Sequence, residues 1–128
     1  WNSPLYSAFD KNYNFYWASW RENNHSKNIL ENNNVFIVIY DSTVPEGTGR
    51  GVYIKAKAYE VSDLRELANA LYLMYSRKSK SPRKVLEFLK GFPRRVYKAV
   101  PEKVWLNGGA DINGNYIDVR KEIDLFAE

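Results

Sequence analysis

The sequence contains no cysteine and a single histidine, His25. Without cysteine the chain can form no disulfide, no thiolate metal site and no cysteine nucleophile. One histidine cannot build a metal site from several imidazoles. The chain also lacks a run of about 18 apolar residues and a visible signal peptide. We therefore expect a cytoplasmic protein that neither spans a membrane nor binds a metal.

Aromatic residues are plentiful, with four Trp, ten Tyr and six Phe among 128 residues. Together with the Val and Ile of the apolar runs, they favour β structure. The length predicts a single domain over residues 1–128. Because Trp1 already reads as the entrance to a strand, we expect the first strand of the fold to be missing from the N-terminus.

Positive charge is concentrated in residues 77–95, where Glu87 is the only acid. The segment carries +7, so the rest of the chain, which is +4 overall, carries −3. The basic residues are Arg77, Lys78, Lys80, Arg83, Lys84, Lys90, Arg94 and Arg95. Such runs mostly form a solvated face. Nucleic-acid binding is not expected, because it needs exposed aromatics and the spacing puts Phe88 and Phe92 on an apolar helical face.

In the first half of the chain, strand patterns surround one short helix. Strands are predicted at residues 4–9 and 14–20, and a helix at 26–32 with Ser26 as its N-cap. Residues 35–40 (VFIVIY) form a continuous apolar run, which predicts a strand buried on both faces. Residues 41–49 form a loop, and residues 51–61 alternate as a strand with one wet face.

The second half changes to helical spacing and then returns to strands. A helix is predicted after Ser62 and Asp63, and a second from Pro82 with Gly91 as its C-terminal cap. Strands at 96–106 and 116–125 flank a long hairpin tip at 107–115. This order predicts a mainly β protein, an antiparallel barrel with peripheral helices.

The most distinctive stretch is residues 15–30 (FYWASWRENNHSKNIL), an aromatic strand that leads through a polar loop into a helix. A helix N-terminus has free N–H groups and the positive end of its dipole, which suit an anion. Ser26 and Lys27 add a hydroxyl and a cation there. A phosphate beside a flat apolar surface describes a site for flavin mononucleotide (FMN).

These motifs, in this order, resemble the pyridoxamine 5′-phosphate oxidase-like, FMN-binding split β-barrel family. The resemblance rests on residues 15–19, 25–29, 51–61, 97–105 and 118–125, and covers nearly the whole chain. It is closer to the small general-stress-protein-like members than to the oxidase itself. It implies an antiparallel split barrel and a homodimer with FMN sites at the subunit interface.

The resemblance also implies the cofactor-binding residues. Tyr16, Trp17 and Ala18 would border the flavin, Ser26 and Lys27 would bind its phosphate with His25 adjacent, and Trp105 would lie close to the cofactor. Four of these residues also have an ordinary alternative role. Ser26 can be a helix cap, Lys27 and His25 solvated surface residues, and Trp105 part of the core.

Departures from the family narrow the expected activity. Asn2, Ser3 and Pro4 stand where the oxidase has an arginine, and Arg120 is not followed by the histidine of its substrate-phosphate pair. The resemblance therefore implies a flavin-dependent oxidoreductase of unknown substrate, and no residue is assigned a catalytic role. The alternative is a carrier or sensor of flavin or deazaflavin that performs no turnover.

Overall fold

The computed structural model describes residues 1–127, and the chain divides into two compact units. Unit 1 comprises Trp1–Asn34 and Lys57–Val100, and unit 2 comprises Val35–Ala56 and the chain from Pro101 onward. Three strands have residues in both units.

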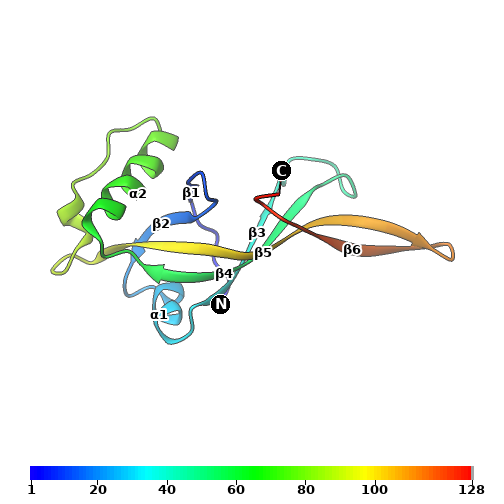
Figure 1. The fold of residues 1–128 in the computed structure, drawn as a ribbon, viewed down its shortest axis with the longest axis horizontal. Coiled ribbons are helices and arrows are strands. Elements are labelled where there is room, and N and C mark those ends of the chain that lie inside the picture. The colour runs from blue at the N-terminus through cyan, green and yellow to red at the C-terminus, as the bar shows by residue number, and fades with distance from the viewer. Residues whose placement is uncertain (128) are drawn as a thin grey trace. The chain divides into compact units, whose positions relative to one another are not determined.

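The elements are predominantly strands (Figure 1). They are β1 (Ala8–Phe9), β2 (Phe15–Trp20), α1 (Asn24–Glu31), β3 (Asn34–Tyr40), β4 (Gly51–Glu60), α2 (Leu64–Arg77), the short 3₁₀ helix η1 (Val85–Phe88), β5 (Arg94–Ile112) and β6 (Asn115–Ile123). The sheet order is β1-β2-β5-β4-β3, with β6 paired to β5. The path has two ends, so the sheet is not closed. The predicted mainly β architecture with peripheral helices is confirmed.

In unit 1, the pairing of β2 with β5 sorts side chains onto two faces. The register is antiparallel and opposes Trp17 to Tyr97 and Tyr16 to Lys98. Because successive side chains of a strand point to opposite faces, Trp17 and Tyr97 share one face and Tyr16 lies on the other.

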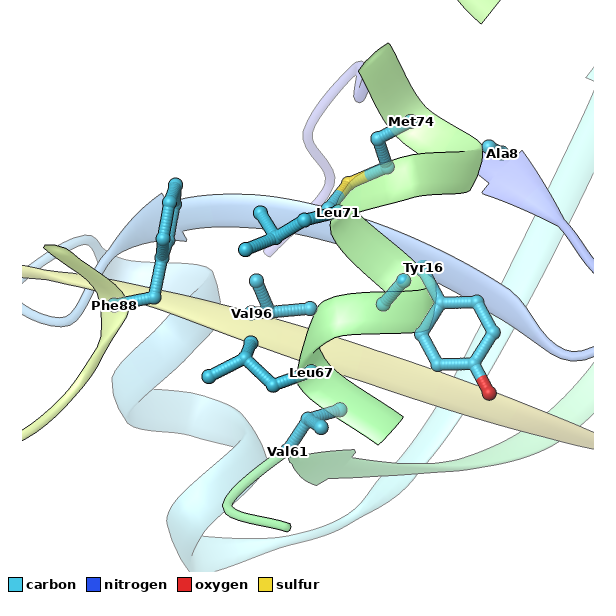
Figure 2. Packing of buried hydrophobic residues seen from close by; sticks show 9 residues of the cluster. Ala8, Tyr16, Val61, Leu67, Leu71, Met74, Phe88 and Val96 are labelled. Carbon is cyan, nitrogen blue, oxygen red and sulfur yellow. The ribbon is translucent and has the colours of Figure 1, made fainter. Parts of the chain in front are cut away.

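The face that carries Tyr16 is covered by α2. Leu67, Leu71 and Met74 of this helix pack with Tyr16 and Val96 in one buried cluster (Figure 2). The helix begins as the sequence predicts, because the Asp63 carboxylate accepts a hydrogen bond of 2.8 Å from the Glu66 N–H. Such a cap satisfies one of the free donors of the first turn.

In unit 2, β5 and β6 form a long hairpin with two different faces. The register opposes Leu106 to Lys121, Gly108 to Val119 and Ala110 to Ile117. One face is therefore mostly apolar. The other carries Trp105, Asn107, Asp111, Tyr116, Asp118, Arg120 and Glu122.

The hairpin tip is shorter than the predicted 107–115 loop, because the strands continue to Ile112 and resume at Asn115. The two-residue turn is Asn113-Gly114, with φ of +54° and +80°. Positive φ at both central positions is the type I′ turn that Asn-Gly favours. This sequence signal was present and was not recognised.

Two other predictions about the elements were wrong. The strand expected at 4–9 is reduced to Ala8–Phe9. The helix expected from Pro82 is only η1, and Gly91 follows it in a loop with φ of +97° rather than as a helix cap. Pro82 itself lies in an exposed stretch without regular structure.

Strand β3 is also not buried on both faces, as its apolar run predicted. Phe36 is 53% exposed and Tyr40 70% exposed, while Val35 and Ile37 are half-buried. The half-buried residues alternate with exposed ones, so only one face of β3 is partly covered, and β3 also ends the path of the sheet.

Leu71→Ala tests the core of unit 1. Leu71 is almost fully buried, so truncation should lower the free energy of unfolding by about 2–5 kcal/mol. Tyr72→Ala is the matched control, because its side chain is exposed on the same helix. Urea unfolding followed by circular dichroism measures both. Equal losses for the two variants would contradict the placement of the core.

Candidate functional site

Helix α1 begins two residues earlier than predicted, and Ser26 is not its N-cap. The cap position is Asn23, and its side chain makes no capping hydrogen bond. The first helical bond runs from the Lys27 N–H to the Asn23 carbonyl, at 3.0 Å. The N–H groups of Asn24, His25 and Ser26 therefore precede the helical hydrogen-bond pattern and form the positive end of the helix dipole.

Ser26 lies in this first turn, fully buried, and its Oγ has no hydrogen-bond partner. Ser26 acts on the pKa of the buried Tyr97 hydroxyl, which places it close to Tyr97, although the pair does not reach hydrogen-bond geometry. Burial raises the pKa of Tyr97 above its usual value, so the phenol stays protonated. A buried hydroxyl without a partner is costly, and this one lies at a helix N-terminus.

His25 belongs to a small polar network that joins α1 to β2. Its Nε2 lies 2.8 Å from Ser19 Oγ, and Asn23 Nδ2 donates to the same oxygen at 2.9 Å. Partial burial lowers the pKa of His25, which favours the neutral imidazole. The Ser19 hydroxyl can then donate to Nε2 while it accepts from Asn23. This network takes the Asn23 side chain away from the capping position.

Lys27 points into solvent and forms a surface ion pair with Glu22, with 3.1 Å between Nζ and Oε2. Arg21 lies on the other side of Glu22, at 3.6 Å. Exposed pairs of this kind contribute about 0–1 kcal/mol, so an arriving anion can displace Glu22 at low cost.

The three predicted residues of β2 are not on one surface. Trp17 is buried on the face of α1 and stacks on Tyr97, with ring centroids 5.9 Å apart, and its Nε1 has no partner. Tyr16 lies under α2 on the other face, and its hydroxyl reaches Asp10 at 3.4 Å. Burial, followed by nearby carboxylates, raises the pKa of Tyr16 to about 12. Ala18 is exposed.

Trp105 belongs to unit 2, where it is half-buried and stacks on Phe36 with ring centroids 6.2 Å apart. The structure therefore brings together Trp17, His25, Ser26 and Lys27 around the start of α1. It places Tyr16 in the core beneath α2.

Sequence reasoning missed Arg95, which it counted among solvated charges. The Arg95 side chain is buried, and its Nε lies 2.8 Å from Glu60 Oε1. Its Nη1 also donates to the carbonyls of Leu89 and Phe92. The register opposes Arg95 to Ser19, so this ion pair lies beside the network of Ser19 and His25. The sequence held one signal of this, because Arg95 stands two residues before Tyr97 in a strand and therefore shares its face.

Two surface depressions of about 350 and 240 Å³ lie elsewhere in unit 1. The larger is lined by Tyr16, Asp10 and residues of α2, and the smaller by residues 59–63, Glu66 and Lys98. Neither includes Trp17 or a residue of α1.

Residues 1–127 contain no group of three or more acidic or histidine side chains placed to hold a metal. Within the same residues, no helix is long and apolar enough to cross a membrane.

His25 allows a direct test of the network, because the sequence has no other imidazole to confuse the titration. Its NMR signal should titrate with a midpoint below about 6.5, the usual value. Because the native state binds a proton less readily than the unfolded chain, stability should fall as the pH drops below about 6.5. His25→Gln should remove that component. A native midpoint at or above the value measured in urea would contradict the burial of the ring.

Comparison with known proteins supports the fold through structure alone. No family model matches the sequence, and no curated protein matches it. A candidate 5-nitroimidazole antibiotic resistance protein from Bacteroides thetaiotaomicron matches with a TM-score of 0.63 at 16% identity, over 81% of this chain and 66% of its own. A protein of unknown function from Agrobacterium tumefaciens gives 0.61 at 17% identity, over 81% of this chain and 43% of its own.

A third solved structure, a candidate pyridoxamine 5′-phosphate oxidase from Corynebacterium glutamicum, gives a TM-score of 0.50 at 18% identity. It covers 81% of this chain and 66% of its own. The chain thus spans less than two thirds of the length of these neighbours. Their shared architecture agrees with the open antiparallel sheet and peripheral helices described above. The chain therefore has the split-barrel fold of the pyridoxamine 5′-phosphate oxidase-like proteins.

Proposed function

We propose that this chain binds FMN through the first turn of α1 and acts as a flavin-dependent oxidoreductase. The observation that carries the proposal is the buried Ser26 hydroxyl without a partner, which lies in a helix N-terminus whose own side-chain cap is absent. In a fold of this type, such a turn suits the phosphate of a flavin nucleotide.

The residues around the turn fit a phosphate. Asn24 and Lys27 are exposed and His25 is half-buried, so an anion can approach from solvent. The N–H groups of the first turn would donate to it, and Lys27 would exchange its pair with Glu22 for the phosphate. Ser26, with no exposed surface, would support the site from beneath.

Strand β2, the aromatic strand, fits the flavin ring of FMN less directly than the α1 turn fits its phosphate. Trp17 and Tyr97 are stacked and buried, so they form a rigid support rather than an open pocket. Ala18 is exposed, but alternation places it on the face of Tyr16 and not on that of α1, so residues 1–127 offer no open strand surface for the ring beside the turn. When bound, FMN supplies electron and hydride transfer, while the protein supplies orientation and electrostatics. We assign no acid or base, and no substrate.

The neighbour from Bacteroides makes 5-nitroimidazoles a reasonable first class of substrate to screen, since its name links this fold to resistance against them. A carrier or sensor of flavin or deazaflavin, without turnover, is the alternative. Flavin that remains bound and is never reduced by common donors would favour that alternative.

We further propose that the active form is a homodimer that covers unit 2. The apolar face of the β5–β6 hairpin exposes Leu106, Ile112, Ile117 and Val119. A two-stranded hairpin is only marginally stable in water when its apolar face is bare. Exposed patches of this kind commonly mark protein interfaces.

The same apolar side continues onto β4. Arg120 stacks over the Tyr53 ring at 3.9 Å, so Tyr53 lies on the polar side of the hairpin. Alternation then places the half-buried Val52 on the apolar side, together with Ile54, which is already buried. A second copy of the chain would bury the part of this surface that remains exposed.

Purified protein should bind added FMN, with flavin absorption bands that persist through gel filtration. Lys27→Ala should weaken binding about tenfold, which corresponds to about 1.4 kcal/mol, because a charged phosphate contact is lost. Lys11→Ala is the control, since Lys11 is an exposed lysine in the β1–β2 turn. Titration of flavin fluorescence gives the Kd of each protein.

A folded protein that refuses FMN would contradict the proposal. Equal losses in the Lys27 and Lys11 variants would instead reject the α1 site while leaving flavin binding intact. Ser26→Ala adds a second test. It should weaken FMN binding without lowering stability, because the hydroxyl has no partner in the free chain.

Ile117→Asn should shift the protein from dimer to monomer, because it introduces an amide into the apolar face. Asp118→Asn introduces the same side chain on the polar face of the same strand and should leave the dimer intact. Sedimentation velocity at several concentrations distinguishes the two states. A monomeric wild-type protein at tens of micromolar would contradict the proposed dimer.

A further inference from the structure

Residues 77–94, which we call the basic segment, present all but one of their cations without an ion-pair partner among residues 1–127. Arg83 pairs with Glu87 at 3.2 Å, and it is the only cation of the segment that forms an ion pair within residues 1–127. The exposed members are Arg77, Lys78, Lys80, Arg83, Lys84 and Lys90. An excess of exposed charge of one sign attracts an extended polyanion.

The backbone of the segment is also open. Residues 78–84 have neither helix nor strand, and every one of them is exposed. Residues 78–80 form a turn after α2, and residues 81–84 continue as irregular chain, so the cations are not spread around the surface of a helix. Exposed cations that succeed one another along the chain can contact successive phosphates.

Exposed aromatic rings lie at both ends of the segment. At one end, Arg77 and Lys78 each lie 4.8 Å from the centroid of the Tyr6 ring. At the other end, Arg94 lies 5.3 Å from the centroid of Trp20. Tyr6 is 47% exposed and Trp20 48% exposed, with the neighbouring cations lying over their rings.

Phe92 adds a third ring, and it overturns the sequence argument against nucleic acid. That argument placed Phe88 and Phe92 on a buried helical face. Phe88 is indeed buried, but Phe92 is 48% exposed because the segment forms no helix beyond η1. Exposed aromatics, which were the missing requirement, are present.

The loop that carries Phe92 is held in place by Arg95. The guanidinium Nη1 donates to the Leu89 carbonyl at 3.0 Å and to the Phe92 carbonyl at 2.6 Å, and Nε pairs with Glu60. Because Arg95 is buried, these bonds are shielded from water. Phe92 and Lys90 are thus displayed on a backbone ordered before any ligand arrives, which lowers the entropic cost of binding.

We propose that the basic segment, with Tyr6, Trp20 and Phe92, binds single-stranded nucleic acid. Base stacking on exposed aromatics and phosphate contacts with lysine and arginine are the two interactions that such binding uses, and it is largely independent of sequence. An anionic membrane is the less suitable partner. Membrane insertion needs several apolar side chains, and Leu86, at 66%, is the one branched aliphatic residue of the segment that is exposed to solvent, since Val85 and Leu89 are half-buried.

The test uses the full chain and a fluorescein-labelled 20-nucleotide oligo(dT), with oligo(U) and a 20-base-pair duplex for comparison. Anisotropy should show binding to both single strands that weakens steeply with salt. Phe92→Leu keeps the apolar volume but removes the π face, and it should weaken binding about fivefold or more. Lys80→Ala should reduce the salt slope by about 0.7.

Phe92→Tyr, which retains a stacking ring, should bind like the wild type, and Lys11→Ala should leave the salt slope unchanged. Thermal unfolding confirms that each variant is folded. Failure of the wild type to bind at 50 mM salt would overturn the proposal, as would equal binding by Phe92→Leu. Sedimentation with vesicles of 70% phosphatidylcholine and 30% phosphatidylserine, in the absence of oligonucleotide binding, would assign the segment to membranes instead.

Discussion

Alternation of side chains along β2 is the constraint on which unit 1 depends. Each strand residue must face one side of the sheet or the other, and this strand carries bulky aromatics on both. Tyr16 needs one cover, supplied by α2, and Trp17 needs another on the opposite face. The chain meets the second requirement by folding directly from β2 into α1, which the Ser19–His25 contact fixes at its start. The polar first turn of α1 is therefore held against the stacked rings of Trp17 and Tyr97 by packing. It is not held by a side-chain cap of its own.

The sequence was sufficient wherever a local rule decided the structure. The Ser62-Asp63 pair predicts the start of a helix, and that helix is present. The alternation of residues 51–61 predicts a strand with one face in water, and that strand is also present. The ordered motifs also predicted the split barrel. Local rules failed at the start of α1, because the Asn23 side chain is engaged by Ser19, a residue of the preceding strand. No pattern within residues 23–32 carries that information.

Two further failures have a common physical origin, in that the partner of a side chain was not a sequence neighbour. Arg95 reads as one more surface cation, yet it is buried by Glu60 and by carbonyls of its own loop. The Arg95 guanidinium donates to backbone carbonyls of residues 89 and 92, in or next to the stretch for which the spacing had predicted a helix. In the candidate site, residue types predicted which groups would gather at α1. Strand alternation puts the adjacent residues Tyr16 and Trp17 on opposite faces, but residue types could not show that α2 covers one face and α1 joins the other.

The exposed position of β3 has a consequence for the life of the newly made chain. Residues 35–40 combine high β-propensity with no charge and no proline, the composition of segments that stack into cross-β fibrils. They also lie in the last strand of the sheet path, where unpaired backbone groups can template a further strand. Three asparagines precede this apolar run, and Asp41 follows it directly as the nearest charged residue on its C-terminal side. A polypeptide that emerges slowly, or at high local concentration, therefore faces competition between native assembly and amyloid-like aggregation, and chaperones would influence which prevails.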